Sequence, residues 1–210
     1  MHPADLHRLL ENIVRLGTIA EVDHTQARAR VQCGELLTTW LPWLTLRAGN
    51  DRTWWAPDPG EQVLVLSPGG DPAQAVILPA LYQAAHPAPA YAGDLHRTGY
   101  QDGTVLEYDR GASRSRAIYP DGAVVEYDAR AHALKATGIG TATITAVERI
   151  TLHAPTLELI GDIEHYGNQT TTGDIAAKGD VADGTRSMAA DRAIYNAHVH
   201  GGSPGPSMPQ

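Results

Sequence analysis

Two histidines near the C-terminal end of the sequence, His198 and His200, have the residue type and the spacing of a metal-binding pair. In an extended strand, residues i and i+2 point to the same side, so both imidazoles would face one way and Val199 the other. The segment of residues 195–202 therefore predicts two nitrogen ligands for a metal ion.

Two ligands do not complete a metal site. Structural zinc takes about four ligands, and an octahedral first-row ion takes about six. The missing ligands come from elsewhere in the chain or from symmetry-related copies of the strand; otherwise the histidines are exposed polar residues at a frayed terminus. Around a three-fold axis, three copies would give one ion six nitrogens and leave no open position. Such a site would be a structural clamp and not a catalytic centre.

The composition argues against several classes of function. A formal net charge of −8 at pH 7 disfavours a nucleic-acid partner, because phosphate binding needs a basic surface. Cys33 is the single cysteine, so it forms no intrachain disulfide or cysteine-based metal site, and we expect a small buried residue there. A signal-peptide pattern is missing at the N-terminus, and no apolar run reaches the ~18 residues of a membrane span. The sequence thus predicts a soluble chain made in a cytoplasm.

The N-terminal part is predicted to be a helix followed by a small barrel. Apolar residues recur at three- and four-residue steps from Pro3 to Val14, as in an amphipathic helix. Over residues 15–82, alternating segments separated by Pro-Gly and Gly-Gly-Asp turns predict five or six antiparallel strands closed on themselves. The expected strands include residues 36–46 and Trp54-Trp55. All four tryptophans lie in this region, where we expect core and interface packing.

A stiff Pro-Ala segment follows, and beyond it the sequence repeats. Residues 100–109 return as residues 119–128, each copy being an Asp-Gly turn and an alternating strand. Leu106 would share a face with Tyr108, and Val125 with Tyr127. Glu107 and Glu126 are repeat-equivalent positions, which we expect to be exposed and solvated, not a glycosidase pair. Later short strands are expected at residues 141–147, 149–153 and 156–160.

The apolar content of the later segment predicts an oligomer. Only twelve of the 59 residues from Ala129 to Ser187 are Leu, Ile or Val, close to the ~20% below which a lone chain tends to be disordered. Three intertwined chains would bury one strand face of each against two partners and pair the strand edges. The sequence thus requires an oligomer where the His-x-His pair needs a symmetry axis.

The short helix, small barrel, Pro-Ala linker, repetitive strand-rich segment and terminal residues 192–200 together resemble the central spike of contractile tails. This family is phage baseplate assembly protein V, shared with R-type pyocins and related to the spikes of type VI secretion. The resemblance covers essentially the whole chain. Its most specific part is the His-x-His pair with the upstream Tyr195-Asn196.

The resemblance implies an all-β fold in four parts. These are an N-terminal helix with an OB-fold barrel (1–85), a linker (86–99), an intertwined trimeric, triple-stranded β-helix as shaft (100–187), and a metal-capped apex (188–210). At the apex, His198 and His200 of three chains would bind one axial iron ion in octahedral geometry. The resemblance further implies a structural spike without catalysis, which pierces the host outer membrane when the sheath contracts. The barrel would attach it to the tail hub and baseplate proteins, at the tail tip of a virion or pyocin particle.

Two other functions remain open from the sequence. The tryptophans of the barrel could bind carbohydrate, with the shaft as a receptor-binding tail fibre. A non-haem iron enzyme could use His198 and His200 with a carboxylate such as Asp191, but this needs a walled pocket with open metal positions. The gap between barrel and shaft is too short for the lysozyme-like domain that some spikes carry.

Overall fold

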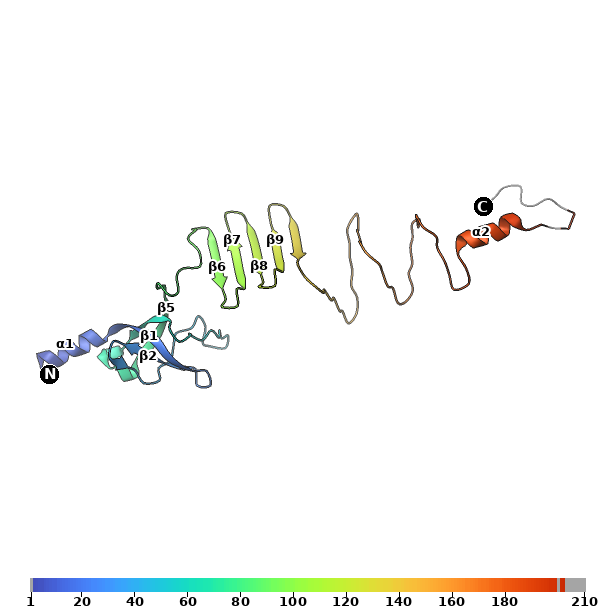
Figure 1. The fold of residues 1–210 in the computed structure, drawn as a ribbon. Helices are drawn as coiled ribbons and strands as arrows, with labels where there is room; N and C mark the ends of the chain where they lie inside the picture. Colours follow the sequence, from blue (N-terminus) through green and yellow to red (C-terminus); the bar gives the residue numbers. More distant parts are fainter. Residues whose placement is uncertain (1, 200, 203–210) are drawn as a thin grey trace. The chain divides into compact units, whose positions relative to one another are not determined.

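A computed structural model describes residues 2–199, 201 and 202 of the chain (Figure 1). The chain divides into two compact units, Met1–Thr145 and Ala146–Gln210. Strands dominate the first unit, which begins with a helix. Among the described residues, no helix combines the length and the apolar character needed to cross a membrane.

The first helix, α1 (Pro3–Asn12), starts where the sequence predicts it and ends just before Val14, which already belongs to a strand. Its N-terminus is capped by His2, whose side chain accepts a hydrogen bond from the Ala4 amide at 3.2 Å. Pro3 fits the first turn because an amide there has no helical partner to lose. Leu6 and Leu10 lie exposed on this helix.

The barrel consists of β1 (Val14–Asp23), β2 (Arg28–Cys33), β3 (Leu36–Leu37), β4 (Gln62–Leu66) and β5 (Val76–Leu81). Their order is β3-β2-β1-β4-β5, with antiparallel neighbours, and two short 3-10 turns, Pro68–Gly70 and Pro72–Gln74, join β4 to β5. The chain after β3 closes the sheet: Leu41 exchanges backbone hydrogen bonds with Ala29, and the Leu44 amide donates to the Ile77 carbonyl at 2.8 Å. The predicted closed barrel is confirmed, although the closing bridge between Trp43 and Ile77 is parallel.

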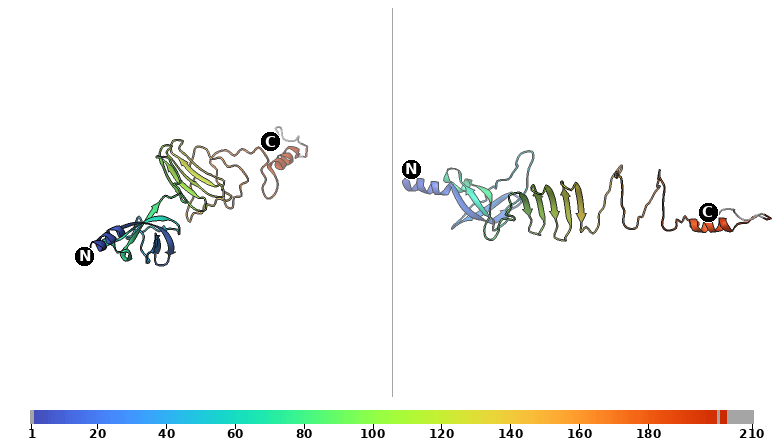
Figure 2. Two further views of the ribbon diagram at one scale, coloured as in Figure 1. Left: turned by 60° about the vertical axis from the view of Figure 1, so that its left-hand side comes forward. Right: turned by 90° about the horizontal axis from the view of Figure 1, so that it is seen from above.

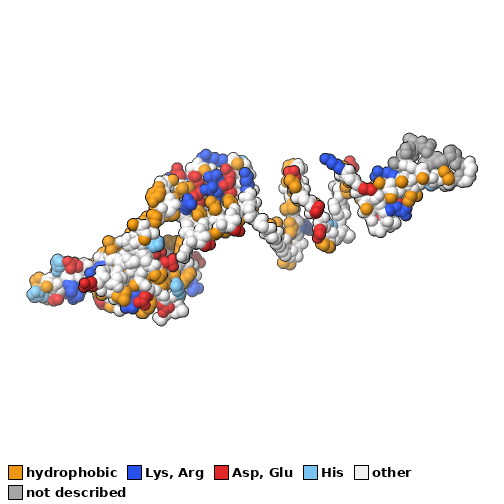
Figure 3. Space-filling view, viewed as in Figure 1, with side chains coloured by type: hydrophobic (Ala, Val, Ile, Leu, Met, Phe, Trp, Pro, Cys, Tyr) orange, Lys and Arg blue, Asp and Glu red, His pale blue; other side chains and the backbone are white. Residues whose placement is uncertain are grey.

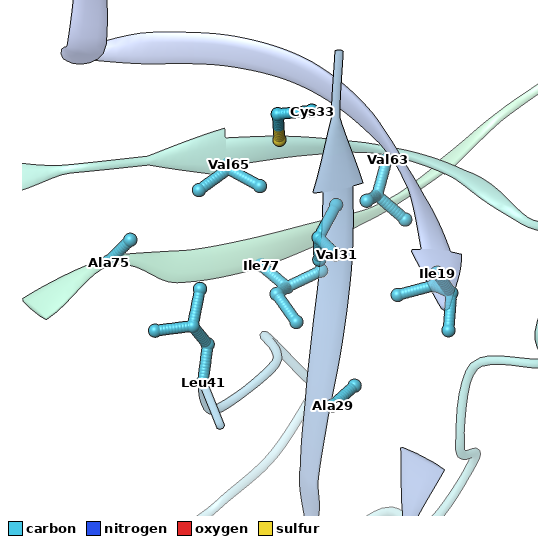
Figure 4. Packing of buried hydrophobic residues seen from close by; sticks show 9 residues of the cluster. All are labelled: Ile19, Ala29, Val31, Cys33, Leu41, Val63, Val65, Ala75 and Ile77. Carbon is cyan, nitrogen blue, oxygen red and sulfur yellow. The ribbon is translucent and has the colours of Figure 1, made fainter. Parts of the chain in front are cut away.

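Alternate residues of the strands fill the interior of the barrel, as the two-residue period of a strand requires (Figure 4). The buried cluster consists of Ile19, Ala29, Val31, Cys33, Leu41, Val63, Val65, Ala75 and Ile77. Cys33 is a small buried residue, as expected, and its burial raises the pKa of the thiol. This core lies entirely within one chain.

The structure differs from the prediction at three places around the barrel. Of the strand expected at residues 36–46, only Leu36–Leu37 forms β3, and Leu41 and Trp43 form isolated bridges. Trp54 and Trp55 lie in a loop and not in a strand, because residues 44–55 turn back on themselves through Thr45 and Thr53. The segment 86–99, predicted as linker, contains β6 (Leu95–Gly99), so the linker is shorter than expected. The alternation of His96 and Thr98 with their neighbours was too weakly apolar to indicate a strand.

A second sheet follows, made of β6, β7 (Val105–Asp109), β8 (Arg114–Ile118), β9 (Val124–Asp128) and β10 (Ala133–Thr137). Each strand pairs antiparallel with the next in the chain, which gives a simple meander (Figure 2). The sequence repeat is thus a two-strand unit: β7 with β8, then β9 with β10.

The two Asp-Gly turns of the repeat have the same structure. Asp102 accepts a hydrogen bond from the Thr104 amide at 2.8 Å, and Asp121 accepts one from the Ala123 amide at 2.9 Å. Gly103 and Gly122 have φ angles of 90° and 88°, a region that side chains with a Cβ rarely adopt. The predicted hairpin turns are confirmed in both copies.

Beyond β10 the chain runs in extended legs joined by bends, without strand or helix between Gly138 and Val181 (Figure 1). The strands expected at residues 141–147, 149–153 and 156–160 are therefore not formed within one chain. No backbone hydrogen bond joins described residues within 139–180. A strand is defined by its ladder of hydrogen bonds to a neighbouring strand. These segments are extended, but among the described residues they have no neighbouring strand with which to form such a ladder.

The chain then enters a second helix, α2 (Met188–Ala197). The expectation of an extended strand at residues 195–197 is wrong. Ser187 caps the helix by accepting a hydrogen bond from the Ala190 amide at 3.2 Å, and the alanine-rich sequence that follows favours helix. This Ser cap with Asp191 in the first turn was the signal for α2 that the sequence prediction missed.

Gly17 of β1 offers a test of the barrel. A Cβ at this position would collide with Val31, and would lie 2.6 Å from the Cys33 Sγ atom and 2.9 Å from the Gln32 carbonyl oxygen. We expect Gly17→Ala to lower the free energy of unfolding by about 1–3 kcal/mol, the usual cost of overpacking. Gly49→Ala, where nothing lies within 4 Å, is the matched control and should change it by less than about 0.5 kcal/mol. Denaturant unfolding at one fixed protein concentration measures both; equal effects of the two variants would contradict the packing described here.

Candidate assembly face and metal apex

The register of the second sheet sorts its side chains onto two different faces. Arg97, Glu107, Arg116, Glu126 and Lys135 are paired neighbours in one row across β6 to β10. The charge alternates at every step of this row, which we call the charged row. Lys, Arg, Asp and Glu side chains gather over this part of the chain (Figure 3). Opposite charges on directly facing strands stabilise a sheet, whereas like charges would destabilise it.

Glu107 is the centre of the charged row. Its carboxylate lies 2.7 Å from Nη2 of Arg116 and 3.5 Å from Nη1 of Arg97, and its side chain is only 5% exposed. Arg114 approaches Glu126 at 3.7 Å, and that carboxylate is partly buried as well. The expectation that Glu107 and Glu126 are exposed and solvated is wrong, because the long arginine side chains of the neighbouring strands cover them. Single-strand alternation could not reveal these cross-strand partners.

The opposite face of the sheet is largely apolar and uncovered. The register confirms that Leu106 shares this face with Tyr108, and Val125 with Tyr127. A shallow hollow of about 430 Å³ lies on this face. We call it the apolar face, and its central residues are Leu106, Tyr108, Ala117, Val125, Tyr127 and Leu134. Contiguous apolar surface of this kind usually marks a site of association.

The aliphatic side chains that follow the sheet are exposed without exception. Every described residue from Leu134 to Arg186 is exposed, including Ile160, which is 91% accessible. Apolar residues recur at two-residue steps, as in Ile150 with Leu152 and Leu157 with Leu159. These pairs would form one apolar side of each extended leg if a partner strand lay beside it.

His198, the first histidine of the predicted metal pair, lies at the end of α2. His198 is the C-cap residue, with φ −70° and ψ 142°, and its amide donates to the Ile194 carbonyl. Its ring Nδ1 lies 2.6 Å from the carbonyl oxygen of Tyr195. A carbonyl only accepts hydrogen bonds, so Nδ1 carries the proton and Nε2 keeps the lone pair that a metal needs. His200 lies outside the described residues.

Two aspartates stabilise the start of α2, one by accepting hydrogen bonds and the other by forming an ion pair. Asp180 receives hydrogen bonds from the Ser187 side chain and from the backbone amides of Ala189 and Val181, which lower the pKa of its carboxyl. Asp191 forms an ion pair with Arg186 at 3.2 Å. Asp191 and His198 are seven residues apart on one helix, roughly 10 Å along its axis. Within one chain, Asp191 therefore does not join His198 in a ligand set.

The described part of the chain contains no group of three or more His, Cys, Asp or Glu side chains that could hold a metal ion. Within the described residues, a site at His198 therefore needs further ligands. The two ways of completing it that the sequence left open are still His200 with ligands elsewhere in the chain, or further copies of the chain.

The barrel and much of the rest of the chain are similar in sequence to known proteins. Residues 15–82 match the sequence model of the family described as the type VI secretion system/phage-baseplate injector OB domain. A curated relative, the "Spike protein" of Escherichia phage P2, is 41% identical over 151 residues. The chain belongs to the phage baseplate spike family. The aligned region makes up 72% of this spike-family chain and 63% of the P2 protein, so the chain spans less than two thirds of its relative.

The family match supports the expected OB domain in the barrel of this spike-family chain, over residues 15–82. The resemblance drawn from the sequence is likewise confirmed, although its most specific part was the His-x-His pair and not the barrel. The structure is mostly β, with an N-terminal helix and an OB domain, as expected. The triple-stranded β-helix and the metal-capped apex remain predictions.

The charged row gives a prediction that distinguishes two equivalent carboxylates. Glu107→Gln removes the charge that two arginines share in a largely water-excluded position. We expect it to lower the free energy of unfolding by about 1–3 kcal/mol. Glu126→Gln, at the equivalent position of the second repeat, has one longer ion pair and more solvent, so it should cost less than about 1 kcal/mol. Thermal and urea unfolding of both variants measure the difference; a larger loss at Glu126 would contradict the assigned ion pairs.

Proposed function

We propose that this chain forms the trimeric central spike of a contractile-tail baseplate, a structural protein that pierces the host outer membrane when the sheath contracts. The barrel attaches it to the tail hub and baseplate, and the shaft and apex form the point. The particle is a virion or a pyocin. Membership of the baseplate spike family supports the structural role, and the piercing step is inferred from the architecture.

The single observation that carries the proposal is that no backbone hydrogen bond joins described residues within 139–180. An isolated chain gains almost nothing from holding this segment in a defined course, because fixing each backbone residue costs about 1–2 kcal/mol of conformational entropy. Its aliphatic side chains are exposed, and its backbone has no ladder within the chain. Two further copies of the same extended legs supply both missing partners, since identical chains have matching lengths and alternation.

The two faces of the sheet fit this arrangement. In the trimer, the apolar face turns inward and meets the same face of two other copies. The charged row turns outward, where its alternating signs leave little uncompensated charge on the surface. A smooth, internally neutralised exterior suits a part that must slide through a membrane without binding to it.

The apex is proposed to hold one iron ion through His198 and His200 of three chains. The described residues fit a metal: the Tyr195 carbonyl fixes the tautomer of His198, leaving Nε2 as the donor. The C-terminal end of α2 also carries partial negative charge, which favours a cation beside it. The ion would pin the three chain ends together, so that the point does not fray under load.

A test of the trimer uses the two faces of the sheet. The chain should run as a trimer in light scattering, and Leu106→Glu should dissociate it, because three carboxylates would then be buried without partners on the apolar face. Thr137→Glu places the same charge on the opposite, exposed face of β10 and should leave the trimer intact. A monomeric parent chain, or a trimer that tolerates Leu106→Glu and dissociates with Thr137→Glu, would contradict the arrangement.

A second test counts the metal. Elemental analysis of the purified trimer should give one ion per three chains, with iron as the expected metal. His198→Ala removes three of six ligands at once, so the metal should be lost while the trimer stays intact and its melting temperature changes little. His165→Ala alters another exposed histidine and serves as the control, with full metal content expected. One ion per chain, or full metal content after both His198→Ala and His200→Ala, would place the site elsewhere.

A further inference from the structure

The barrel carries a second exposed apolar surface, the loop of residues 44–55, which we call the tryptophan hairpin. Leu44, Leu46, Trp54 and Trp55 are all exposed on it; Leu46 is 90% accessible, and Trp54 and Trp55 are 63% and 66% accessible. These are large side chains to leave in water on a loop of this length. Aromatic residues in such positions are typical of the centre of protein interfaces.

The tryptophan hairpin is preformed and not a loose loop. The Thr53 amide donates to the Arg47 carbonyl at 3.0 Å, and the Thr45 and Thr53 hydroxyls lie 2.6 Å apart. Arg47 and Asp51 approach each other across the tip at 3.8 Å. Trp54 meets the ring of Trp43, which packs against the barrel core, at a centroid distance of 5.6 Å. A preformed apolar loop loses little entropy when a partner covers it.

A ring contact connects the tryptophan hairpin to the second sheet. Trp55 stacks on Tyr100 with a centroid distance of 6.1 Å and an interplanar angle of 12°. Tyr100 follows Thr98 at a two-residue step, and Thr98 pairs with Leu106. Tyr100 therefore continues the side of the sheet that bears the apolar face. The tryptophan hairpin and the apolar face thus adjoin one another at the Trp55–Tyr100 contact.

We propose that the tryptophan hairpin packs against a second copy of this chain, so that the trimer contact extends from the apolar face onto the barrel. This inference rests on the proposed trimer. Once the apolar face is buried by neighbouring copies, a surface that adjoins it is within reach of the same copies. The hairpin has two cations, Arg47 and Arg52, and one anion, Asp51, so it offers no strong charge for a polyanion. One ring face of Trp55 is already covered by Tyr100, which makes the pair a poor platform for a sugar.

Site-specific photo-crosslinking in the full chain tests this contact. p-Benzoylphenylalanine replaces Leu46 on the hairpin, Leu134 on the apolar face, or Glu35 in the exposed turn before β3, one position at a time. After irradiation, denaturing gels should show covalent dimers and trimers for Leu46 and Leu134, and monomer alone for Glu35. Crosslinking at Leu134 without crosslinking at Leu46 overturns this inference and leaves the proposed trimer standing. Absence of crosslinks at both positions rejects both.

Fluorescence quenching gives an independent measure. In the intact trimer, a neighbouring copy shields Trp54 from acrylamide, so Trp54→Phe should leave the quenchable fraction of the emission unchanged. If Trp54 stays open to solvent, or awaits a different protein, Trp54→Phe should instead remove a large part of that quenchable fraction. Light scattering on the same samples confirms that the trimer is present, so this second result overturns the inference directly.

Discussion

Backbone amides and carbonyls need partners, and within residues 139–180 no backbone hydrogen bond joins one described residue to another. In water an extended segment can satisfy these groups with solvent, but solvent does not fix its course. The proposals for the rest of the molecule follow from these missing backbone hydrogen-bond partners. In the proposed trimer, two further copies would supply these partners, and the proposed packing of the apolar faces and the proposed shared metal ion would hold the three copies together.

From the barrel through the second sheet to the extended legs, each successive part of the chain buries less of its own apolar surface. The barrel closes its own sheet and buries its own core around Val31 and Ile77. The second sheet is intermediate. The charges of its charged row are paired between its own strands around Glu107, whereas the large side chains of its apolar face are exposed. The extended legs after β10 have neither a ladder nor a core. In the proposed spike, the independently folded barrel would be the part that attaches to the baseplate, and the extended legs would be the part that folds only with other copies.

The sequence was sufficient wherever the determining interactions are local. Period-two alternation and Asp-Gly turns led to the barrel and the hairpins, since these signals involve residues close together in the chain. It failed at Glu107, whose partners Arg97 and Arg116 come from neighbouring strands, and a charged residue in an alternating pattern normally indicates solvent. It failed again at α2, where the His-x-His spacing indicated a strand, whereas the Ser187 cap and the alanines that follow favour a helix. The strands at residues 141–160 were expected from alternation, but alternation cannot show whether a partner strand comes from the same chain.

The two-strand repeat of the second sheet also has a consequence for the length of the molecule. Each copy, Tyr100 to Ile118 and Tyr119 to Thr137, contributes one acidic strand and one basic strand to the charged row. Each also begins with the same Asp-Gly turn on the same side of the sheet. A duplicated or deleted copy would therefore preserve register, charge alternation and the apolar face together. The sheet would change by two strand spacings, roughly 10 Å, at each such event. Duplication or loss of this unit would therefore change the length of the second sheet in fixed steps, without any change to the barrel or to α2.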